Sequence, residues 1–461
     1  MLHRRAFLGL SAAAVMAPAV VRAQGVTDVD VAVVGAGAAG IAAALKVAAA
    51  NRKVVVIEAD DRIGGRCVTD TRTFGVPFDR GARWIHAPDT NPVARAVVRA
   101  GIDIYGAPPG QKVRIGRRYA REGEMEDYLS ALARARRAID DASRRADVSC
   151  AQALPKDLGD WQRTVEFVLG PWASGKDVSD LSSADLTRAA DRDVEAFSRL
   201  GFGALVAKLG ERLPVRLSTP VTRINWGNRW GVDIQTPRGE FAARAVIVTV
   251  STAVLTAGRI QFNPAIGRQM EAASRLSLGS YDHIALDLPG NPLGLQRDDL
   301  VFEQAAGVRT GALLANLSGS TLCTVDVGGR FGRDLAAQGE KAMIAFALDW
   351  LDGLYGTSLK SGATRAAATR WNAAPYVMGA FSAAAPGGAA FRRVLMEGVG
   401  GRLWFAGEAA HETLWGTVGG AWDSGERAAN EALKAIGAVK EPAPAQPAPP
   451  PQQRKRRKKQ S

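Results

Sequence analysis

The residues best suited to chemistry begin with a glycine-rich turn. Gly35-Ala36-Gly37-Ala38-Ala39-Gly40 follows the β-branched run 29–34 and leads into an Ala-rich stretch that ends at Ala50. A second apolar run, 54–57, ends in Glu58. Glycines at this spacing let the backbone approach a pyrophosphate at the start of a helix, and the carboxylate can accept hydrogen bonds from a ribose diol. Because strand, turn, helix, strand and acid occur in this order, the sequence predicts a dinucleotide site.

The segment after Glu58 places two arginines around a pair of glycines. It reads Ala59-Asp60-Asp61-Arg62-Ile63-Gly64-Gly65-Arg66. The glycines permit close approach of the backbone, and the arginines supply positive charge to phosphates or to the adenine side of a dinucleotide.

Four later segments add further motifs. They are Asp79-Arg80-Gly81-Ala82-Arg83-Trp84-Ile85-His86, Pro220-Val221-Thr222-Arg223-Ile224, the string Trp371-x(3)-Pro375-Tyr376-x(2)-Gly379-Ala380-Phe381-Ser382, and the run from Trp404-Phe405-Ala406-Gly407-Glu408 through Gly416-Thr417-Val418-Gly419-Gly420-Ala421 to 424–429.

Together these motifs resemble those of the flavin-containing amine oxidase superfamily, which includes the monoamine and polyamine oxidases. They run from about Asp28 to Leu433, and the segments 84–86 and 416–418 resemble the polyamine oxidase branch. The resemblance implies an α/β fold: a Rossmann-like FAD-binding domain of the glutathione-reductase type, with a substrate domain of mixed sheet plus helices. It implies non-covalent FAD, because Ala380 stands where monoamine oxidases have the flavin-linking Cys.

The resemblance also assigns residues to FAD. In the family, the segment 81–86 runs along the flavin ring, the strand at Val221 holds adenine through its backbone, Trp371 lies against the flavin, and a helix that begins after Thr417 points at the flavin. The implied cofactor residues are Gly35, Ala36, Gly37, Ala39, Gly40, Glu58, Ala59, Arg62, Gly64, Gly65, Arg66, Gly81, Ala82, Arg83, Trp84, Val221, Trp371, Gly407, Glu408, Thr417, Val418 and Ala421.

The activity that the resemblance implies is amine oxidation. A hydride passes from the α-carbon of the amine to flavin N5, and the resulting imine hydrolyses to an aldehyde or ketone. Neutralising an amine of pKa near 10 at pH 7 costs roughly 4 kcal/mol, and an apolar aromatic slot lowers that pKa by desolvation. Phe381 is expected to form one wall of this slot. Thr417 stands where monoamine oxidases have a Tyr, and Tyr281 is expected to supply an aromatic edge instead.

Histidine is rare in this chain, with only four residues. Apart from His3, they are His86, His283 and His411, which all fall in motifs expected near the flavin. The family places a Lys near flavin N5, and the segment 279–284 aligns His283 with it. A His can hold a water there but is mostly neutral at pH 7, so oxygen is expected to be a poor acceptor and a periplasmic electron carrier becomes an alternative. We predict a catalytic set of His283, Tyr281, Phe381, Thr417 and His86.

Two other functions remain open from the sequence. An L-amino-acid oxidase would need an Arg to grip the substrate carboxylate, for which Arg83 and Arg309 are candidates. The second open function is non-enzymatic: a non-catalytic flavoprotein, or a nucleic-acid partner that acts through its basic tail. Three acids, Glu195, Asp282 and Glu303, are candidates for holding a distal ammonium group, but the sequence does not place them.

The elements that position these residues form a discontinuous cofactor domain, expected at 28–74, 213–256 and 394–438. The substrate domain is expected at 75–212 and 257–393. Apolar side chains at helical spacing predict a helix in the first of these two stretches: Met125, Tyr128, Leu129, Leu132, Ala135 and Ile139. Alternation at 281–288 predicts a strand, and 339–355 reads as a helix. We find no repeat and no internal membrane segment.

Composition and charge place limits on function. The 461 residues carry a formal charge of +13, with 47% hydrophobic and 23% charged residues. These values exclude a wholly disordered, collagenous or disulfide-scaffold protein and fit two or three domains. The charge lies mostly at the ends: residues 1–23 contain no acid, and 454–459 are all basic. The pI therefore says little about the substrate.

The two ends of the chain have the composition of a targeting signal and of a disordered tail. Paired arginines, Arg4 and Arg5, precede an apolar run and the small-residue site Val21-Arg22-Ala23. Residues 1–23 thus resemble a twin-arginine signal peptide, which implies a periplasmic or secreted protein. The Pro-rich basic segment 441–461 is expected to be disordered, with weak contact to anionic surfaces and no specific nucleic acid. The three cysteines match no metal pattern and are compatible with one disulfide.

Overall fold

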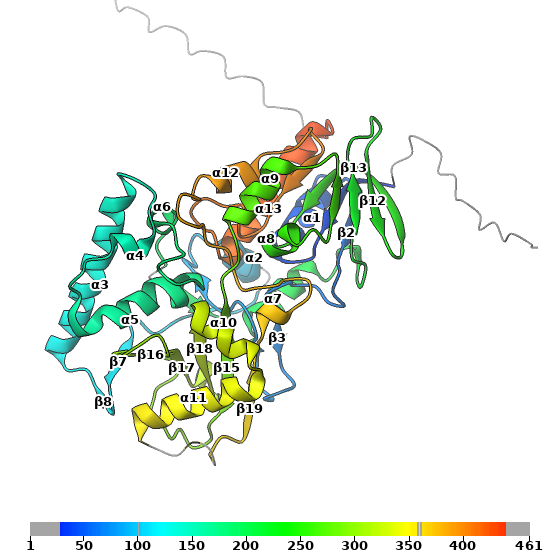
Figure 1. Ribbon diagram of the computed structural model, residues 1–461. Coiled ribbons are helices and arrows are strands. Elements are labelled where there is room, and N and C mark those ends of the chain that lie inside the picture. The colour runs from blue at the N-terminus through cyan, green and yellow to red at the C-terminus, as the bar shows by residue number, and fades with distance from the viewer. Residues whose placement is uncertain (1–27, 100, 193, 357–358, 360–361, 439–461) are drawn as a thin grey trace, which may run out of the picture.

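The computed structural model describes residues 28–99, 101–192, 194–356, 359 and 362–438. The expected signal peptide at 1–23 and the tail at 441–461 lie outside the described residues. Figure 1 shows two sheets with a helical arm beside them.

The first sheet carries the dinucleotide motif. Its order is β10-β2-β1-β13-β12-β11-β14, and β20 also pairs with β13. The bounds are β1 Val29–Val34, β2 Val54–Ile57, β10 Val215–Arg216, β11 Arg223–Asn225, β12 Val232–Thr236, β13 Gly239–Val248, β14 Gln261–Asn263 and β20 Leu403–Phe405. Strand β1 is parallel to both β2 and β13. Helices cover both faces of the sheet, so β1 is buried on both sides, which explains the valines along this strand.

Small residues let the helices approach this sheet closely. On one face, α1 (Ala38–Ala49) packs against α13 (Val418–Ala435), and a Cβ on Gly425 would lie 2.1 Å from Ala39 O. The same core includes α2 (Pro92–Arg99) and α7 (Phe202–Gly210). The opposite face is covered by α8 (Thr252–Thr256), α9 (Gly267–Arg275) and α12 (Phe391–Met396).

The second sheet is mixed, as expected. Its order is β19-β15-β18-β17-β16-β7-β8, with β15 antiparallel to β18 and β16 parallel to β7. The bounds are β7 Lys112–Ile115, β8 Arg118–Tyr119, β15 Tyr281–Asp287, β16 Asp299–Glu303, β17 Ala312–Ala315, β18 Leu322–Gly328 and β19 Arg365–Ala368. Helices α10 (Gly329–Ala337) and α11 (Glu340–Tyr355) pack against it.

Short strands connect the sheets to the site. Strand β3 (Thr69–Asp70) pairs with β4 (Phe78–Asp79), and β9 (Glu195–Phe197) lies between β5 (Ile85–His86) and β6 (Tyr105–Gly106). The single-turn elements are η1 Gly159–Trp161, η2 Val168–Trp172, η3 Leu317–Gly319 and η4 Trp371–Ala373.

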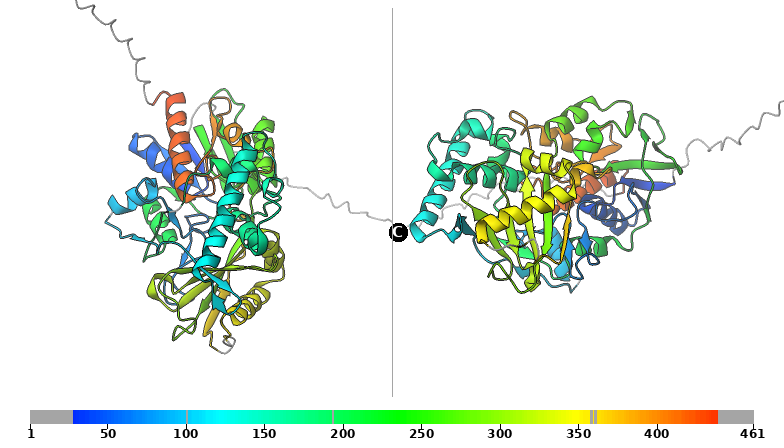
Figure 2. Two further views of the ribbon diagram at one scale, coloured as in Figure 1. Left: turned by 90° about the vertical axis from the view of Figure 1, so that its left-hand side faces the viewer. Right: turned by 60° about the horizontal axis from the view of Figure 1, so that its bottom comes forward.

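The helical arm consists of α3 (Glu122–Ser143), α4 (Cys150–Ala153), α5 (Gln162–Phe167) and α6 (Ser183–Arg188), and Figure 2 shows α3 along its outer side. The predicted stripe on α3 is buried at Tyr128, Leu132, Ala135 and Ile139. The prediction that Leu129 belongs to the buried stripe is wrong, because this residue is 47% exposed. It follows Tyr128 directly and therefore points about 100° away from the buried stripe.

The structure differs from the sequence-based expectations in two further respects. Strand β14 lies inside the expected substrate segment 257–393, yet it pairs with β11 of the first sheet. The chain therefore leaves the cofactor domain only after α9, which packs on the same core. All three cysteines are buried and free, so no disulfide forms. Within the described part of the chain, no helix combines the length and apolar character that a membrane crossing needs.

Candidate functional site

A cavity of about 1400 Å³ passes between the two sheets and the helical arm. This volume exceeds the roughly 300–1,000 Å³ of an ordinary small-molecule pocket, which leaves room for a dinucleotide and a substrate together. All the predicted cofactor and catalytic residues line the cavity, with the exceptions of Ala36 and Gly40.

At one end of the cavity, glycines form a cradle around the start of α1. Gly35 has a φ of +106°, and a Cβ there would lie 2.6 Å from Thr249 Oγ1. A Cβ on Gly65 would lie 3.1 Å from Gly37 Cα, so the two glycine loops adjoin. Gly37 is the N-cap of α1 and provides no capping side chain. The first backbone N–H groups of α1 are therefore free to bind an anion.

Glu58 closes this end of the cavity. Its Oε2 accepts a hydrogen bond from Ala36 N at 2.5 Å, and its Oε1 accepts one from Asp60 N at 2.8 Å. Burial raises the pKa of Glu58 despite these N–H donors. Two expected ligands need correction: Ala36 is fully buried and donates to Glu58, and Gly40 packs on Gly35 O, which a Cβ would meet at 1.9 Å.

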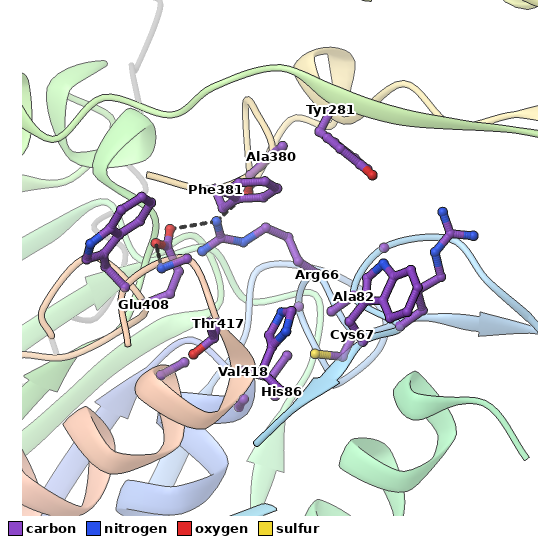
Figure 3. Close-up of a pocket in the computed structure, with 18 of the residues that line it drawn as sticks. Arg66, Cys67, Ala82, His86, Tyr281, Ala380, Phe381, Glu408, Thr417 and Val418 are labelled. Carbon is purple, nitrogen blue, oxygen red and sulfur yellow. Dashed lines mark hydrogen bonds and ion pairs between the residues drawn. The ribbon is translucent and has the colours of Figure 1, made fainter. Parts of the chain in front are cut away.

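In the middle of the cavity, Arg66 and Glu408 join two distant segments (Figure 3). Arg66 Nη1 donates to Glu408 Oε1 at 2.8 Å and to Ala380 O at 2.5 Å. Glu408 Oε2 also accepts from Ser382 Oγ at 2.7 Å and from Gly416 N at 3.1 Å. Burial by itself would raise the pKa of Glu408, but the charge of Arg66 and the hydrogen bonds from Ser382 and Arg66 hold it below its ordinary value.

The N-terminus of α13 faces the same space. Thr417 Oγ1 accepts from Gly420 N at 2.9 Å and donates to Leu414 O at 2.7 Å, so the predicted catalytic hydroxyl serves as the helix cap. Val418 and Ala421 line the cavity beside it. The helix dipole places partial positive charge at this point.

Aromatic side chains gather where the cavity reaches β15 of the second sheet. The ring centroids of Tyr281 and Phe381 lie 5.7 Å apart, with planes tilted by 48°. Trp371 packs on Gly81, where a Cβ would lie 2.9 Å from Trp371 Cζ2, and its Nε1 donates to Arg80 O at 2.8 Å. Figure 3 shows Phe381 and Tyr281 on one side of Arg66, and His86 and Thr417 on the other. The structure therefore places the two expected aromatic residues, Phe381 and Tyr281, next to each other.

His283 also reaches this end, but in a different arrangement from the one expected. Its Nε2 donates to Gly81 O at 2.9 Å, and its Nδ1 lies 2.8 Å from Asp326 Oδ1. The expected water-holding role needs a free ring nitrogen, and both nitrogens have protein partners. His411 does not line the cavity: its Nδ1 accepts from Thr413 N at 3.2 Å and Leu414 N at 2.9 Å.

Neither arginine proposed to grip a substrate carboxylate is available. Arg83 donates to Thr324 Oγ1 at 2.6 Å and forms a buried ion pair with Asp326. Arg309 lies over Phe331 and Phe346, 5.7 and 4.9 Å from the ring centroids, and is not part of the cavity wall.

The structure places the three candidate acids. Glu195 lines the cavity: its Oε1 lies 3.0 Å from His86 Nδ1, and its Oε2 is buried with no hydrogen-bond partner among the described residues. Glu303 accepts from Thr310 and Trp350, and Asp282 accepts from Thr369 and the Trp371 backbone; neither lines the cavity. Only Glu195 therefore lies where a substrate can reach it.

Sequence reasoning missed several residues of this site. Arg192 lines the cavity, donates to Trp415 O at 2.7 Å and lies 5.2 Å from the Trp415 ring centroid. Burial lowers the pKa of Arg192 to about 10. Asp326 was also missed, although a single acid inside the apolar run 322–328 is a signal that a partner is needed. In the described part of the chain, no cluster of acidic, His and Cys side chains could hold a metal ion.

Comparisons with known proteins agree with this geometry. A family model described as flavin containing amine oxidoreductase matches residues 38–433. Polyamine oxidase 4 of Oryza sativa subsp. japonica is 26% identical over 448 residues, covering 88% of this chain and 89% of the relative. Lysine-specific histone demethylase 2 of Homo sapiens is 27% identical over 450 residues, covering 87% of this chain. The chain spans about half the demethylase, 53% of its length.

Solved structures share the fold. A cyclohexylamine oxidase from Brevibacterium oxydans IH-35A superposes with a TM-score of 0.75 at 21% identity, covering 89% of this chain and 100% of that one. A putrescine oxidase bound to putrescine superposes with a TM-score of 0.74 at 19% identity, covering 88% and 99%.

Proposed function

The chain belongs to the flavin-containing amine oxidoreductase family, and from this premise we propose that it oxidises an amine whose nitrogen enters between Phe381 and Tyr281. One observation carries the proposal: the aromatic pair, with ring centroids 5.7 Å apart, lines the same cavity as the glycine cradle. A dinucleotide held at the cradle therefore shares the cavity with the aromatic slot.

The residues present fit FAD. The side-chain-free cradle at Gly35, Gly37 and Gly65 leaves space for a pyrophosphate at the start of α1. Glu58 supplies buried carboxylate oxygens for a ribose, and the α13 N-terminus supplies positive potential farther along. FAD would be held without a covalent bond, since Ala380 carries no nucleophile. When bound, FAD supplies a two-electron acceptor for the amine.

The chain's own residues prepare the substrate for this reaction. Phe381 and Tyr281 exclude water from the amine nitrogen, and desolvation favours its neutral form. The Tyr281 hydroxyl donates to Asp326 Oδ2 at 2.8 Å, so this ring is locked in place and presents carbon atoms to the slot. Burial raises the pKa of Tyr281 well above its ordinary value, so the phenol stays neutral and adds no charge to the slot.

Glu195 gives the site its preference for amines with a second positive charge. Its side chain lines the cavity, and its Oε1 lies 3.0 Å from His86 Nδ1, so a carboxylate faces the substrate space. An ammonium group beyond the reacting amine would pair with this carboxylate. We therefore favour a diamine or polyamine over a simple alkylamine.

An amino acid is the second candidate, favoured by Arg192. This arginine lines the cavity, and burial lowers its pKa only to about 10, so it is a cation at neutral pH. A substrate carboxylate would pair with its guanidinium. Arg192 thus replaces Arg83 and Arg309 as the residue on which an amino-acid oxidase activity would depend.

The test is anaerobic mixing of the purified yellow protein with one substrate of each type: a monoamine, a diamine, a polyamine and an L-amino acid. We expect the flavin absorbance to bleach fastest with the diamine or polyamine. Arg192→Leu would then leave that rate unchanged, whereas loss of bleaching by an L-amino acid in this variant would support the second candidate. No bleaching by any amine would contradict the proposal. Admitting air afterwards tests whether oxygen reoxidises the flavin, and slow reoxidation would favour another acceptor, such as a periplasmic carrier.

A further inference from the structure

Four polar side chains form a buried cluster in the wall of the cavity at its aromatic end. We call Arg83, His283, Asp326 and Tyr281 the Arg83 cluster. Arg83 and His283 are each 4% exposed, and Asp326 is 2% exposed. Arg83, His283 and Tyr281 all line the cavity. The cluster joins the segment that precedes β5 to the second sheet, because β15 and β18 pair with His283 opposite Asp326.

Asp326 is the centre of the cluster. It accepts from the Arg83 guanidinium, from Tyr281 OH at 2.8 Å and from the His283 ring. Burial alone would raise the pKa of Asp326, but Arg83 and His283 lower it to about 2. Asp326 is therefore a carboxylate throughout the neutral range, and it compensates the charge of one cation.

The His283 ring has a hydrogen-bond partner in either of two protonation states. Nε2 faces the Gly81 carbonyl, which can only accept, so Nε2 carries a proton. Nδ1 lies 2.8 Å from Asp326 Oδ1, an acceptor, and 2.9 Å from Arg83 Nη2, a donor. A protonated Nδ1 donates to Asp326, and an unprotonated Nδ1 accepts from Arg83. The ring can thus gain or lose a proton without moving.

We propose that His283 is the proton switch of the Arg83 cluster and that, by changing the cluster between neutral and singly positive, it sets the reduction potential of the bound flavin. With Nδ1 protonated, Arg83 and His283 together exceed the charge of Asp326 by one unit. With Nδ1 neutral, Arg83 and Asp326 cancel. His283 is therefore a positioning residue for charge, which acts on the cofactor through the cavity wall.

Other charged groups near His283 are few. Asp79 faces Arg83 from the segment 78–86, and Asp282 adjoins His283 on β15. On the β19 side, Thr369 Oγ1 accepts from His283 N at 2.9 Å, and Arg370 acts on Asp282. Burial raises the pKa of Asp282 to about 6, so this carboxyl is the one neighbour whose titration must be separated from that of His283.

The link to the potential follows from charge balance. Reduction takes two electrons from the reductant and one proton from solvent, so the flavin ring gains one negative charge. A positive cluster stabilises this charge, most strongly in a buried site of low dielectric. Protonation of His283 should therefore raise the potential, and deprotonation should lower it.

The experiment measures the midpoint potential of the bound FAD from pH 5.5 to 9 by photochemical reduction against a reference dye. We compare the wild-type holoenzyme with His283→Gln, whose amide can still donate to Gly81 O but cannot carry the proton. At low pH the midpoint potential of the variant should lie at least about 30 mV below that of the wild type. For a two-electron couple this difference corresponds to a tenfold change in the equilibrium constant of reduction. At high pH the two potentials should converge.

Two further variants complete the test. His283→Asn, whose amide can replace the donor to Asp326, should behave as His283→Gln does, so that loss of FAD by one variant does not end the test. Asp282→Asn should keep the pH-dependent step of the wild type. Parallel curves for the wild type and a folded His283 variant would overturn the proposal, and so would loss of the pH-dependent step in Asp282→Asn. This inference rests on the proposed flavin site; because the reductant is not an amine, its failure is distinguishable from failure to oxidise amines.

Discussion

Arg66 and Glu408 lie 342 residues apart in the chain, yet Arg66 Nη1 and Glu408 Oε1 are separated by 2.8 Å. The arginine belongs to the glycine loop after β2, and the glutamate follows β20. Both strands belong to the first sheet, so the ion pair ties the first cofactor motif to the last at the middle of the cavity.

Removing this arginine should weaken cofactor binding. Arg66→Ala removes the hydrogen-bonded cation of the buried Glu408 carboxylate and leaves Arg392 as the other cation that acts on it. An unsatisfied buried group costs about 1–3 kcal/mol, and more when it is charged. We expect the FAD dissociation constant to rise at least tenfold and the thermal midpoint of the holoprotein to fall by several degrees. Flavin absorbance per protein and calorimetry measure the two effects. Arg72→Ala, on the exposed loop of the same region, should change neither.

The aromatic slot makes a second prediction. Phe381→Ala admits water to the amine nitrogen, and each unit by which the substrate pKa is no longer lowered costs about tenfold in the neutral fraction. We expect the anaerobic rate of flavin reduction to fall 10- to 100-fold at pH 7, with partial recovery at pH 9. Tyr281→Phe keeps the ring and should lose less than fivefold. A Phe381→Ala rate that is equally low at both pH values would show that the slot does not act by desolvation.

The nucleotide site could be predicted from sequence because its determinants are local. Gly35 needs a positive φ, Gly40 needs close packing, and Glu58 follows the next strand at a fixed distance. Steric rules within one strand-turn-helix unit fix all three positions. The slot residue Phe381 was likewise predicted, from the resemblance of its surrounding motif.

The Arg83 cluster could not be predicted in the same way. Arg83 and Asp326 are 243 residues apart, and their contact depends on the register of β15 against β18, which places His283 opposite Asp326. No local pattern encodes that register, and a one-residue slip would point Asp326 to the other face. The cofactor-domain boundary failed for a related reason, since β14 joins β11 only through tertiary pairing.

Glu195 leads to a third prediction, which concerns the substrate. Glu195→Gln removes a buried negative charge while keeping the side-chain shape, and a hydrogen bond to a charged group contributes about 1.5–3 kcal/mol. We expect KM for a diamine or polyamine to rise roughly 10- to 100-fold with little change for an alkyl monoamine. Glu211→Gln, at an exposed site after α7, should leave both values unchanged. An equal loss for monoamine and diamine would remove Glu195 from the ammonium site.

Asp326 makes a fourth prediction, on stability and pH. Its folded-state pKa of about 2 lies below the unfolded value of about 3.9, so the stabilisation is complete above pH 4 and is lost as pH falls toward 2. By linkage it amounts to on the order of 2–3 kcal/mol. Asp326→Asn should therefore unfold at a lower temperature than the wild type at pH 7, and the gap should narrow below pH 4. Calorimetry of the two holoproteins at pH 7, 4 and 3 measures this gap. A gap that stays constant from pH 7 to 3 would mean that the ion pair with Arg83 does not depress the Asp326 pKa.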